Sequence, residues 1–411
     1  MGDLVVSIDI GTSKISTVIG RINKNSQTEI IGKGMVPCSG LKKGIIVDID
    51  SVAASIRSAV DEAEASANIK IGSAFVNIHG MHVNVINNKS WIGISNGNRE
   101  ITRKDVDSLL YSVRDIDIPE DRQLIDVIPR QFIIDGYDEI IDPTGMVGTR
   151  LEVDADIIAG KITSVQNIIK SLERANIRID GIVAETFATG EIVLTSDEKD
   201  MGVIMLDVGG GITDISVYQG KRLIFYDSIP VGGDHITNDI AIGLRISNAE
   251  SEKIKRQYEL ALTSLIKNDQ EISVFDINEN RKKNVKISEV VDIIEARVYE
   301  IFSLCRNQAM KAGVLKNLPA GVVLTGGGIS YVDGNKQLAA EVFELPVRVA
   351  SLSHMGITKS EYITAVGIVK YIANSRRGSS SASETKLPKP RLVSSKENIF
   401  SKFIKLLKEI F

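Results

Sequence analysis

The pattern of apolar and polar residues predicts that the chain begins with a β-hairpin followed by a third strand. Residues 4–10 and 14–22 are predominantly apolar, and the small residues of 11–13 separate them. Such a break between two apolar runs is typical of a hairpin turn. A third strand is expected at 29–36. From 49 to 67 apolar residues recur at helical spacing, which predicts an amphipathic helix.

The opening pattern returns in the second half of the chain. Val203 to Gly209 repeats the apolar order and the Asp-x-Gly ending of Val5 to Gly11. The returning strands also match, because Ile15 to Val18 resembles Ile215 to Tyr218. A local repeat of this kind implies two structurally related halves and hints at an internal duplication.

Between and after these two units, the pattern predicts two further regions. Residues 74–86 read as a strand that enters a small α+β module at 83–162, with a hairpin near Trp91. Residues 236–318 are charged and mostly helical in pattern, and 362–373 read as a helix that closes the fold.

The last part of the chain has a different composition. Residues 374–396 are rich in Ser, Lys and Arg and contain two prolines, which predicts a flexible linker. Residues 397–411 then form an expected amphipathic helix of about 22 Å, too short to cross a hydrocarbon core of about 30 Å. We expect it to lie in an anionic membrane surface. Its apolar face comprises Ile399, Phe400, Phe403, Leu406, Leu407, Ile410 and Phe411, and the lysines beside it are Lys402, Lys405 and Lys408.

Composition narrows the class of protein. The 411 residues suggest two or more domains, and 43% hydrophobic residues are ample for a sizeable core. A net charge of −4 argues against a nucleic-acid partner, which would favour a basic excess. Cys38 and Cys305 fit no paired or metal-ligand spacing, which suggests a reducing compartment. The chain also has no run of about 18 apolar residues that would predict a membrane span.

The two repeated turns carry the candidate chemistry. Glycine-rich turns let backbone N–H groups approach phosphate oxygens closely. The first turn offers Gly11, Thr12, Ser13 and Lys14, and the second offers Gly209, Gly210, Gly211 and Thr213. Asp9 and Asp207 end the preceding strands and would repel phosphate unless a cation intervened. Mg²⁺, held through water, fits between them. The chain contains no Gly-x4-Gly-Lys-[Ser/Thr] motif, so a P-loop is excluded.

These motifs resemble those of the actin-like ATPase superfamily. Asp9 to Thr12 and Leu206 to Asp214 look like its two phosphate motifs, and Leu324 to Ser330 looks like its adenosine motif. The resemblance implies ATP as ligand and an α/β, actin-like (ribonuclease-H-like) two-domain fold. The contacts it implies beyond the two turns are Gly326, Gly327 and Gly328, with Glu252, Lys255 and Arg256 at the base and ribose. It also implies that Glu185 orients the attacking water, although Thr186 follows it where relatives usually carry Pro.

Within the superfamily the chain is similar to the FtsA family of bacterial division proteins. This likeness rests on three features: the inserted module, with Gly148 to Glu152 in it, the segment Val231 to Asp234, and the C-terminal amphipathic helix. The expected division is a first actin-like domain at 1–82 and 163–196, an inserted α+β subdomain at 83–162, a second actin-like domain at 197–235 and 319–373 with a subdomain at 236–318, a linker at 374–396 and the membrane-targeting helix at 397–411.

The FtsA resemblance implies partners and a location. Proteins of this family polymerise, recruit the tubulin-like FtsZ and tether it to the membrane, so the expected location is the cytoplasmic face of the cell membrane at the division site. The expected partners are the FtsZ C-terminal tail, other copies of the chain, an anionic membrane surface and other division proteins. Arg297 falls where the family docks the FtsZ tail and is a candidate contact. Hydrolysis of ATP is expected to be slow at most.

Three other functions of the same superfamily remain open. A sugar or carboxylate kinase would not need the C-terminal helix and would need a substrate-side base. A chaperone would need a peptide-binding domain, and the residues after 373 are too few for one. A type IV pilus assembly scaffold of similar fold is the nearest structural alternative.

Overall fold

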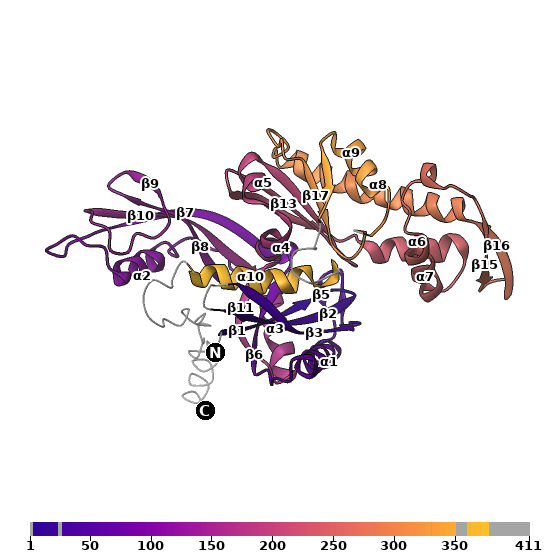
Figure 1. Ribbon diagram of the computed structural model, residues 1–411, viewed down its shortest axis with the longest axis horizontal. Helices are drawn as coiled ribbons and strands as arrows, with labels where there is room; N and C mark the ends of the chain where they lie inside the picture. The colour runs from indigo at the N-terminus through magenta and orange to yellow at the C-terminus, as the bar shows by residue number, and fades with distance from the viewer. Residues whose placement is uncertain (1–2, 24–26, 330, 351–359, 378–411) are drawn as a thin grey trace, which may run out of the picture.

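The computed structural model describes residues 3–23, 27–329, 331–350 and 360–377 (Figure 1). The predicted membrane-targeting helix at 397–411, and the linker beyond Arg377, lie outside the described residues. The final described helix, α10 (Ile363–Arg377), includes residues 374–377, which the sequence pattern had assigned to the linker. Among the described residues, no helix is long and apolar enough to cross a bilayer.

The first half of the duplication is a five-stranded mixed sheet. Its strand order is β11-β6-β1-β2-β3. The first three strands in sequence pair antiparallel, and the two outer strands on the other side run parallel to their neighbours. The strands are β1 (Asp3–Ile10), β2 (Lys14–Ile22), β3 (Thr28–Pro37), β6 (Ser73–Ile78) and β11 (Arg178–Ala184).

Helices cover both faces of this sheet. Alternate residues of a strand face opposite sides, so Ile8 packs with α1 (Ile49–Ala67) and α3 (Ile162–Arg174), whereas Val5 packs with α10. In Figure 1 the yellow α10 lies alongside this sheet. The helix α1 covers the residues that helical spacing predicted. It begins at the side chain of Asp48, which accepts from the N–H groups of Asp50 and Ser51.

The second half repeats this topology. Its sheet has the order β14-β13-β12-β17-β18, again with three antiparallel strands and two parallel ones. The strands are β12 (Val203–Val208), β13 (Thr213–Gln219), β14 (Arg222–Ile229), β17 (Val322–Thr325) and β18 (Val347–Val349). The helices α4 (Glu185–Val193) and α5 (Ser196–Met201) lead into it from the first half, and α9 (Asn335–Phe343) packs on it.

The pairing corrects the match drawn between the two returning strands. Ile10 pairs with Ile15 in the first hairpin, and Val208 pairs with Thr213 in the second. The residue equivalent to Ile15 is therefore Thr213 and not Ile215. Apolar similarity alone cannot detect a shift of two residues, because it leaves every side chain on the same face of the strand.

The inserted module is a four-stranded antiparallel sheet of order β7-β10-β8-β9 with one helix against it. Its elements are β7 (Val83–Gly93), α2 (Arg103–Ser112), β8 (Arg122–Ile134), β9 (Tyr137–Ile140) and β10 (Arg150–Lys161). Two expectations were wrong here. A turn at Gly80–His82 separates the strand predicted at 74–86 into β6 and β7, and Trp91 lies within β7, whose partner is the distant β10.

The charged region that follows β14 contains α6 (Gly233–Leu244), α7 (Asn248–Tyr258) and α8 (Ile287–Lys311). It also contains an unpredicted hairpin of β15 (Glu271–Asp276) and β16 (Arg281–Lys286). The sequence pattern hid this hairpin because polar residues dominate it. Val274 and Val285 are its fully buried apolar side chains.

Candidate functional site

A cavity of about 570 Å³ opens between the two halves, and most of the predicted contact residues line it. The predicted residues in its lining are Asp9, Gly11, Thr12, Ser13, Lys14, Glu185, Asp207, Gly209, Gly210, Glu252, Lys255, Arg256, Gly326, Gly327 and Gly328. Two predicted residues lie behind the lining: Gly211 packs against Thr12, and the Thr213 hydroxyl donates to the Val231 carbonyl at 2.7 Å.

The two repeated turns have the same backbone geometry. The Gly11 N–H donates to the Lys14 carbonyl at 3.0 Å, and the Gly209 N–H donates to the Ile212 carbonyl at 2.9 Å. The turns face each other closely: a Cβ on Gly210 would lie 1.8 Å from the Ser13 Oγ. A side chain at position 210 would displace the Ser13 hydroxyl from its hydrogen bond to Asp234. The result is a pair of turns whose backbones converge on one cavity.

The third glycine triplet closes the cavity from the second half. Gly326 has a φ of +98°, and a Cβ there would lie 2.3 Å from the Val208 carbonyl oxygen. The Gly328 N–H donates to the same carbonyl at 2.7 Å. Both features hold the triplet directly against the end of β12. A glycine surface of this kind lets a ligand approach the backbone closely.

The floor of the cavity is strongly acidic. Asp9, Asp207 and Glu185 are buried, as is Asp214, which sequence analysis had not assigned to the site. Burial, and then the charge of Glu185, raises the pKa of Asp9 to about 7. Burial, followed by repulsion from the other three carboxylates, raises the pKa of Asp207 well above its ordinary value. A positive ion between these oxygens would favour their ionised forms.

Neutral donors orient the two repeated aspartates differently. The Asn77 amide donates to Asp9 Oδ1 at 2.8 Å, and its own Oδ1 accepts from the Ile10 N–H at 2.8 Å. Asp207 instead accepts from the Thr189 hydroxyl at 3.2 Å. Both carboxylates line the cavity and retain further lone pairs, so both can act as oxygen ligands.

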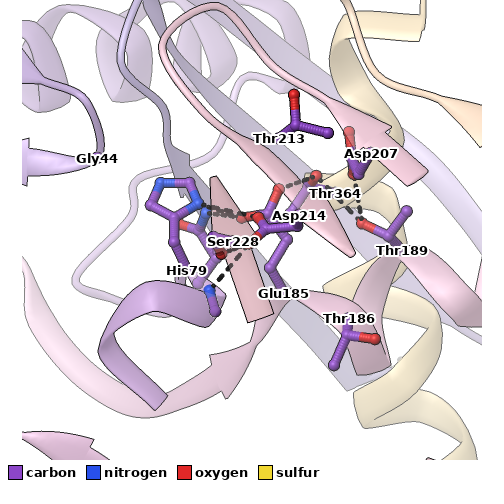
Figure 2. Close-up of polar contacts among 12 residues, drawn as sticks. Gly44, His79, Glu185, Thr186, Thr189, Asp207, Thr213, Asp214, Ser228 and Thr364 are labelled. Atoms are coloured by element: carbon purple, nitrogen blue, oxygen red, sulfur yellow. Dashed lines mark hydrogen bonds and ion pairs between the residues drawn. The ribbon is translucent and has the colours of Figure 1, made fainter. Parts of the chain in front are cut away.

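Glu185 is the first residue of α4 and sits where the chain crosses between the halves. Its carboxylate contacts the imidazole of His79 and accepts from the Thr364 hydroxyl at 3.2 Å (Figure 2). Thr186 hydrogen bonds to Ser216 on β13 at 2.7 Å, which accounts for a polar residue at this position. Burial raises the pKa of Glu185, but His79 and the hydrogen bonds outweigh this, and the net pKa lies below its ordinary value.

The opposite end of the cavity carries the residues predicted to contact the nucleoside. Lys255 is almost fully buried, pairs with Glu252 at 2.6 Å and donates to the Gly233 carbonyl at 3.0 Å. Burial lowers the pKa of Lys255. Arg256 also pairs with Glu252, and its guanidinium lies 5.3 Å from the centre of the Tyr331 ring. This end is therefore more cationic than the floor.

Several lining residues were missed by sequence analysis. His79 and Asp214 join the floor, Asp234 accepts from the Ser13 hydroxyl at 2.8 Å, and Thr364 reaches in from α10. A signal was present for His79, because it follows directly on the buried strand β6. Polar side chains beyond the carboxyl end of a parallel strand commonly form the site of an α/β sheet.

Arg297 lies outside this cavity. It sits on α8, where its guanidinium pairs with Asp239 at 2.5 Å and also with Glu300. The hydrogen bond to Asp239 raises the pKa of Arg297, although burial opposes the charged form. Its predicted role as a partner contact remains a prediction.

The duplicated sheets with a cavity between their turns define an actin-like α/β protein. Solved structures agree in fold: MreB5 of Spiroplasma citri bound to ADP matches with a TM-score of 0.54 at 15% identity, covering 92% of this chain and 99% of that one. A structure described as the PilM-PilN type IV pilus biogenesis complex matches with a TM-score of 0.57 at 15% identity, covering 91% and 98%. At this identity the likeness concerns the fold alone.

Sequence relatives identify the family. The chain is 39% identical to the cell division protein FtsA of Bacillus subtilis, over 91% of this chain and 84% of the relative. It is 30% identical to FtsA of Escherichia coli K12, over 90% of each. The family model "Cell division protein FtsA" matches residues 204–367, and "SHS2 domain inserted in FTSA" matches 80–159. The chain belongs to the FtsA family of cell division proteins.

Proposed function

We propose that this chain is an ATP-binding division protein that polymerises on the membrane and tethers the FtsZ ring to it. The observation that supports nucleotide binding is the pair of facing glycine turns, whose backbones converge on one cavity. The structure of MreB5, which has a similar fold, is bound to ADP, and this fits a nucleotide in the equivalent cleft. The subdomain limits predicted from the sequence form part of this proposal.

In this proposal each part of the cavity has a separate task. The backbone N–H groups and side chains of Gly11 to Lys14 and Gly209 to Gly211 hold the phosphates, and Thr213 supports the second turn from behind. Gly326 to Gly328 lie beside the adenosine, and Glu252, Lys255 and Arg256 surround base and ribose.

Mg²⁺ fits the acidic floor. Asp9 and Asp207 present buried oxygen ligands whose pKa values are raised by burial first and by the neighbouring carboxylates second. Mg²⁺ prefers such oxygens and keeps several waters, so we assign it to these two residues through water. When bound, the ion neutralises phosphate charge. Glu185, held at the domain crossing, orients a water toward the terminal phosphate.

The membrane and FtsZ contacts rest on other parts of the chain. The amphipathic segment 397–411 supplies an apolar face and three lysines for an anionic surface. One such helix binds weakly, and a polymer multiplies it. Arg297 on α8 is proposed to contribute to the site for the FtsZ tail. Membrane-bound filaments would then recruit later division proteins.

Sedimentation with anionic liposomes tests the tether. Full-length protein with ATP should carry FtsZ into the lipid pellet, and a chain ending at 395 should leave both in the supernatant. Neutral liposomes are the control for charge. If the truncated chain still carries FtsZ to the lipid, the tether proposal is wrong. Failure of the full-length protein to bind ATP would separately contradict the nucleotide part.

A further inference from the structure

The contacts of His79 indicate the charge of its ring, and they could not be read from its position in the sequence. Its Nε2 lies 3.1 Å from the Ile10 carbonyl oxygen. Its Nδ1 contacts Glu185 Oε2 and lies 3.7 Å from Asp214 Oδ2. The Ile10 carbonyl and an ionised Glu185 are both acceptors, and beside them both ring nitrogens carry a proton. The surroundings therefore favour a doubly protonated imidazolium.

The wider electrostatics agree with this assignment. Burial disfavours the charged ring, but the carboxylates of Glu185 and Asp214 outweigh burial and raise the pKa of His79 well above its ordinary value. His79 is only 8% exposed, so water screens these charges weakly. The ring is the positive partner of a buried acidic pair.

The three residues His79, Glu185 and Asp214 also come from both halves of the protein. His79 follows β6 of the first sheet, Glu185 begins α4 at the crossing, and Asp214 belongs to β13 of the second sheet (Figure 2). The N–H of Gly80, next to His79, donates to Asp214 Oδ1 at 3.1 Å. Ser228 on β14 contacts the same oxygen. One short loop of the first half therefore holds acids from both sides of the cleft.

We propose that His79 is a positioning residue for nucleotide hydrolysis: its imidazolium keeps Glu185 ionised and in one orientation, and ties that orientation to Asp214 on the other side of the cleft. This inference rests on the proposed role of Glu185. Without His79, Glu185 would share the floor with three other carboxylates and lose its main counter-charge. A protonated or turned Glu185 could no longer accept a hydrogen bond from the attacking water.

Single-turnover hydrolysis of ATP and the Kd of a fluorescent ATP analogue, both with Mg²⁺, separate positioning from binding. His79→Gln keeps a hydrogen-bond donor but removes the charge, so hydrolysis should fall about tenfold or more while Kd stays within about threefold. His79→Lys restores a cation and should recover most of the rate. His82→Gln is the matched control, since His82 is also buried and bonds to the Gly44 carbonyl at 3.0 Å.

A double-mutant cycle adds a readout that a purely structural role would not produce. If His79 acts through Glu185, then His79→Gln should cost little further rate in a Glu185→Gln background. Additive losses, a His79→Gln rate equal to wild type, or failure of His79→Lys to recover activity would overturn the inference. So would tight Zn²⁺ binding by the wild type that His79→Gln abolishes, because the ring would then be a metal ligand.

The outcomes distinguish this inference from the function on which it rests. If Glu185→Gln hydrolyses ATP slowly while His79→Gln hydrolyses it at the wild-type rate, only the role of His79 is rejected. A Glu185→Gln variant as fast as wild type rejects the proposed role of Glu185, and the inference with it. Absence of ATP binding by the wild-type chain rejects the nucleotide proposal itself.

Discussion

The two repeated turns share one backbone but differ in chemistry. Paired strands make Asp9 equivalent to Asp207, and the turn N–H bonds of Gly11 and Gly209 are the same. Thr12 and Ser13 of the first turn correspond to Gly210 and Gly211 of the second. The first also offers an ammonium at Lys14, and the second is followed by the carboxylate of Asp214.

This difference shows how a duplicated unit forms one asymmetric site. Thr12 and Ser13 occupy the space in front of Gly210 and Gly211, so side chains on both turns would collide. The Ser13 hydroxyl uses this closeness to reach Asp234 on α6 of the other half. The duplication supplies two copies of the backbone nest, and the divergence allows the copies to approach each other.

The largest expected effect comes from removing that asymmetry. Gly210→Thr places on the second turn the side chain that the first turn carries, against Ser13 and Asp234. The turns should separate, and affinity for a fluorescent ATP analogue should fall about 100-fold, or about 2.7 kcal/mol. Adding Ser13→Gly should recover part of this loss.

Gly97→Ala is the control for this pair, because a Cβ at Gly97 would meet nothing within 4 Å. Unchanged affinity in Gly210→Thr would mean that the facing turns do not form the phosphate site.

A smaller effect is expected from the charge that only the first turn carries. The Lys14 ammonium lines the cavity, and burial lowers its pKa although nearby acids support the charged form. Lys14→Met should weaken binding of ATP by about tenfold, since it removes a charged phosphate contact of about 1.4 kcal/mol. Isothermal titration calorimetry would measure this, with Lys104→Met on α2 as the surface control. Equal losses for ATP, ADP and adenosine would contradict a phosphate contact.

The last effect concerns the stability of the metal-free protein and not the binding of nucleotide. Burial and the neighbouring Glu185 raise the pKa of Asp9 from its ordinary value of 3.8 to about 7 in the folded state. The native state therefore holds this proton more tightly than the unfolded chain does, and stability is lost as the pH rises from about 4 to about 7. Asp9→Asn cannot ionise, so it should be more stable than wild type by up to about 4 kcal/mol at about pH 8 and should converge with it at low pH.

Urea denaturation between about pH 5 and about pH 8 would measure this difference, with the exposed Asp138→Asn as control. The same Asp9→Asn variant should bind ATP more weakly in the presence of Mg²⁺. Parallel pH profiles for wild type and Asp9→Asn would show that Asp9 is not the group responsible.

Local sequence anticipated the elements whose periodicity is strong. The helix at Ile49–Ala67 and the strand at Lys14–Ile22 have the predicted limits, because their apolar residues follow a regular pattern that the flanking residues break. The hairpin of β15 and β16 was missed because its polar strands lack that regularity. The break at Gly80–His82 was missed because the apolar pattern continues across it.

The sequence by itself determined the duplicated turns, the family resemblance and most of the residues around the cavity. Only the tertiary structure decided how these residues meet. His79, Asp214 and Thr364 lie far apart along the chain, yet His79 and Thr364 contact Glu185 and a carboxylate oxygen of Asp214 lies within 4.8 Å of it. Periodicity reports which face of an element is buried. Contacts between elements depend on how the two sheets pack. This packing places His79 beside Glu185 and Asp214, where it is the counter-ion of the cavity floor.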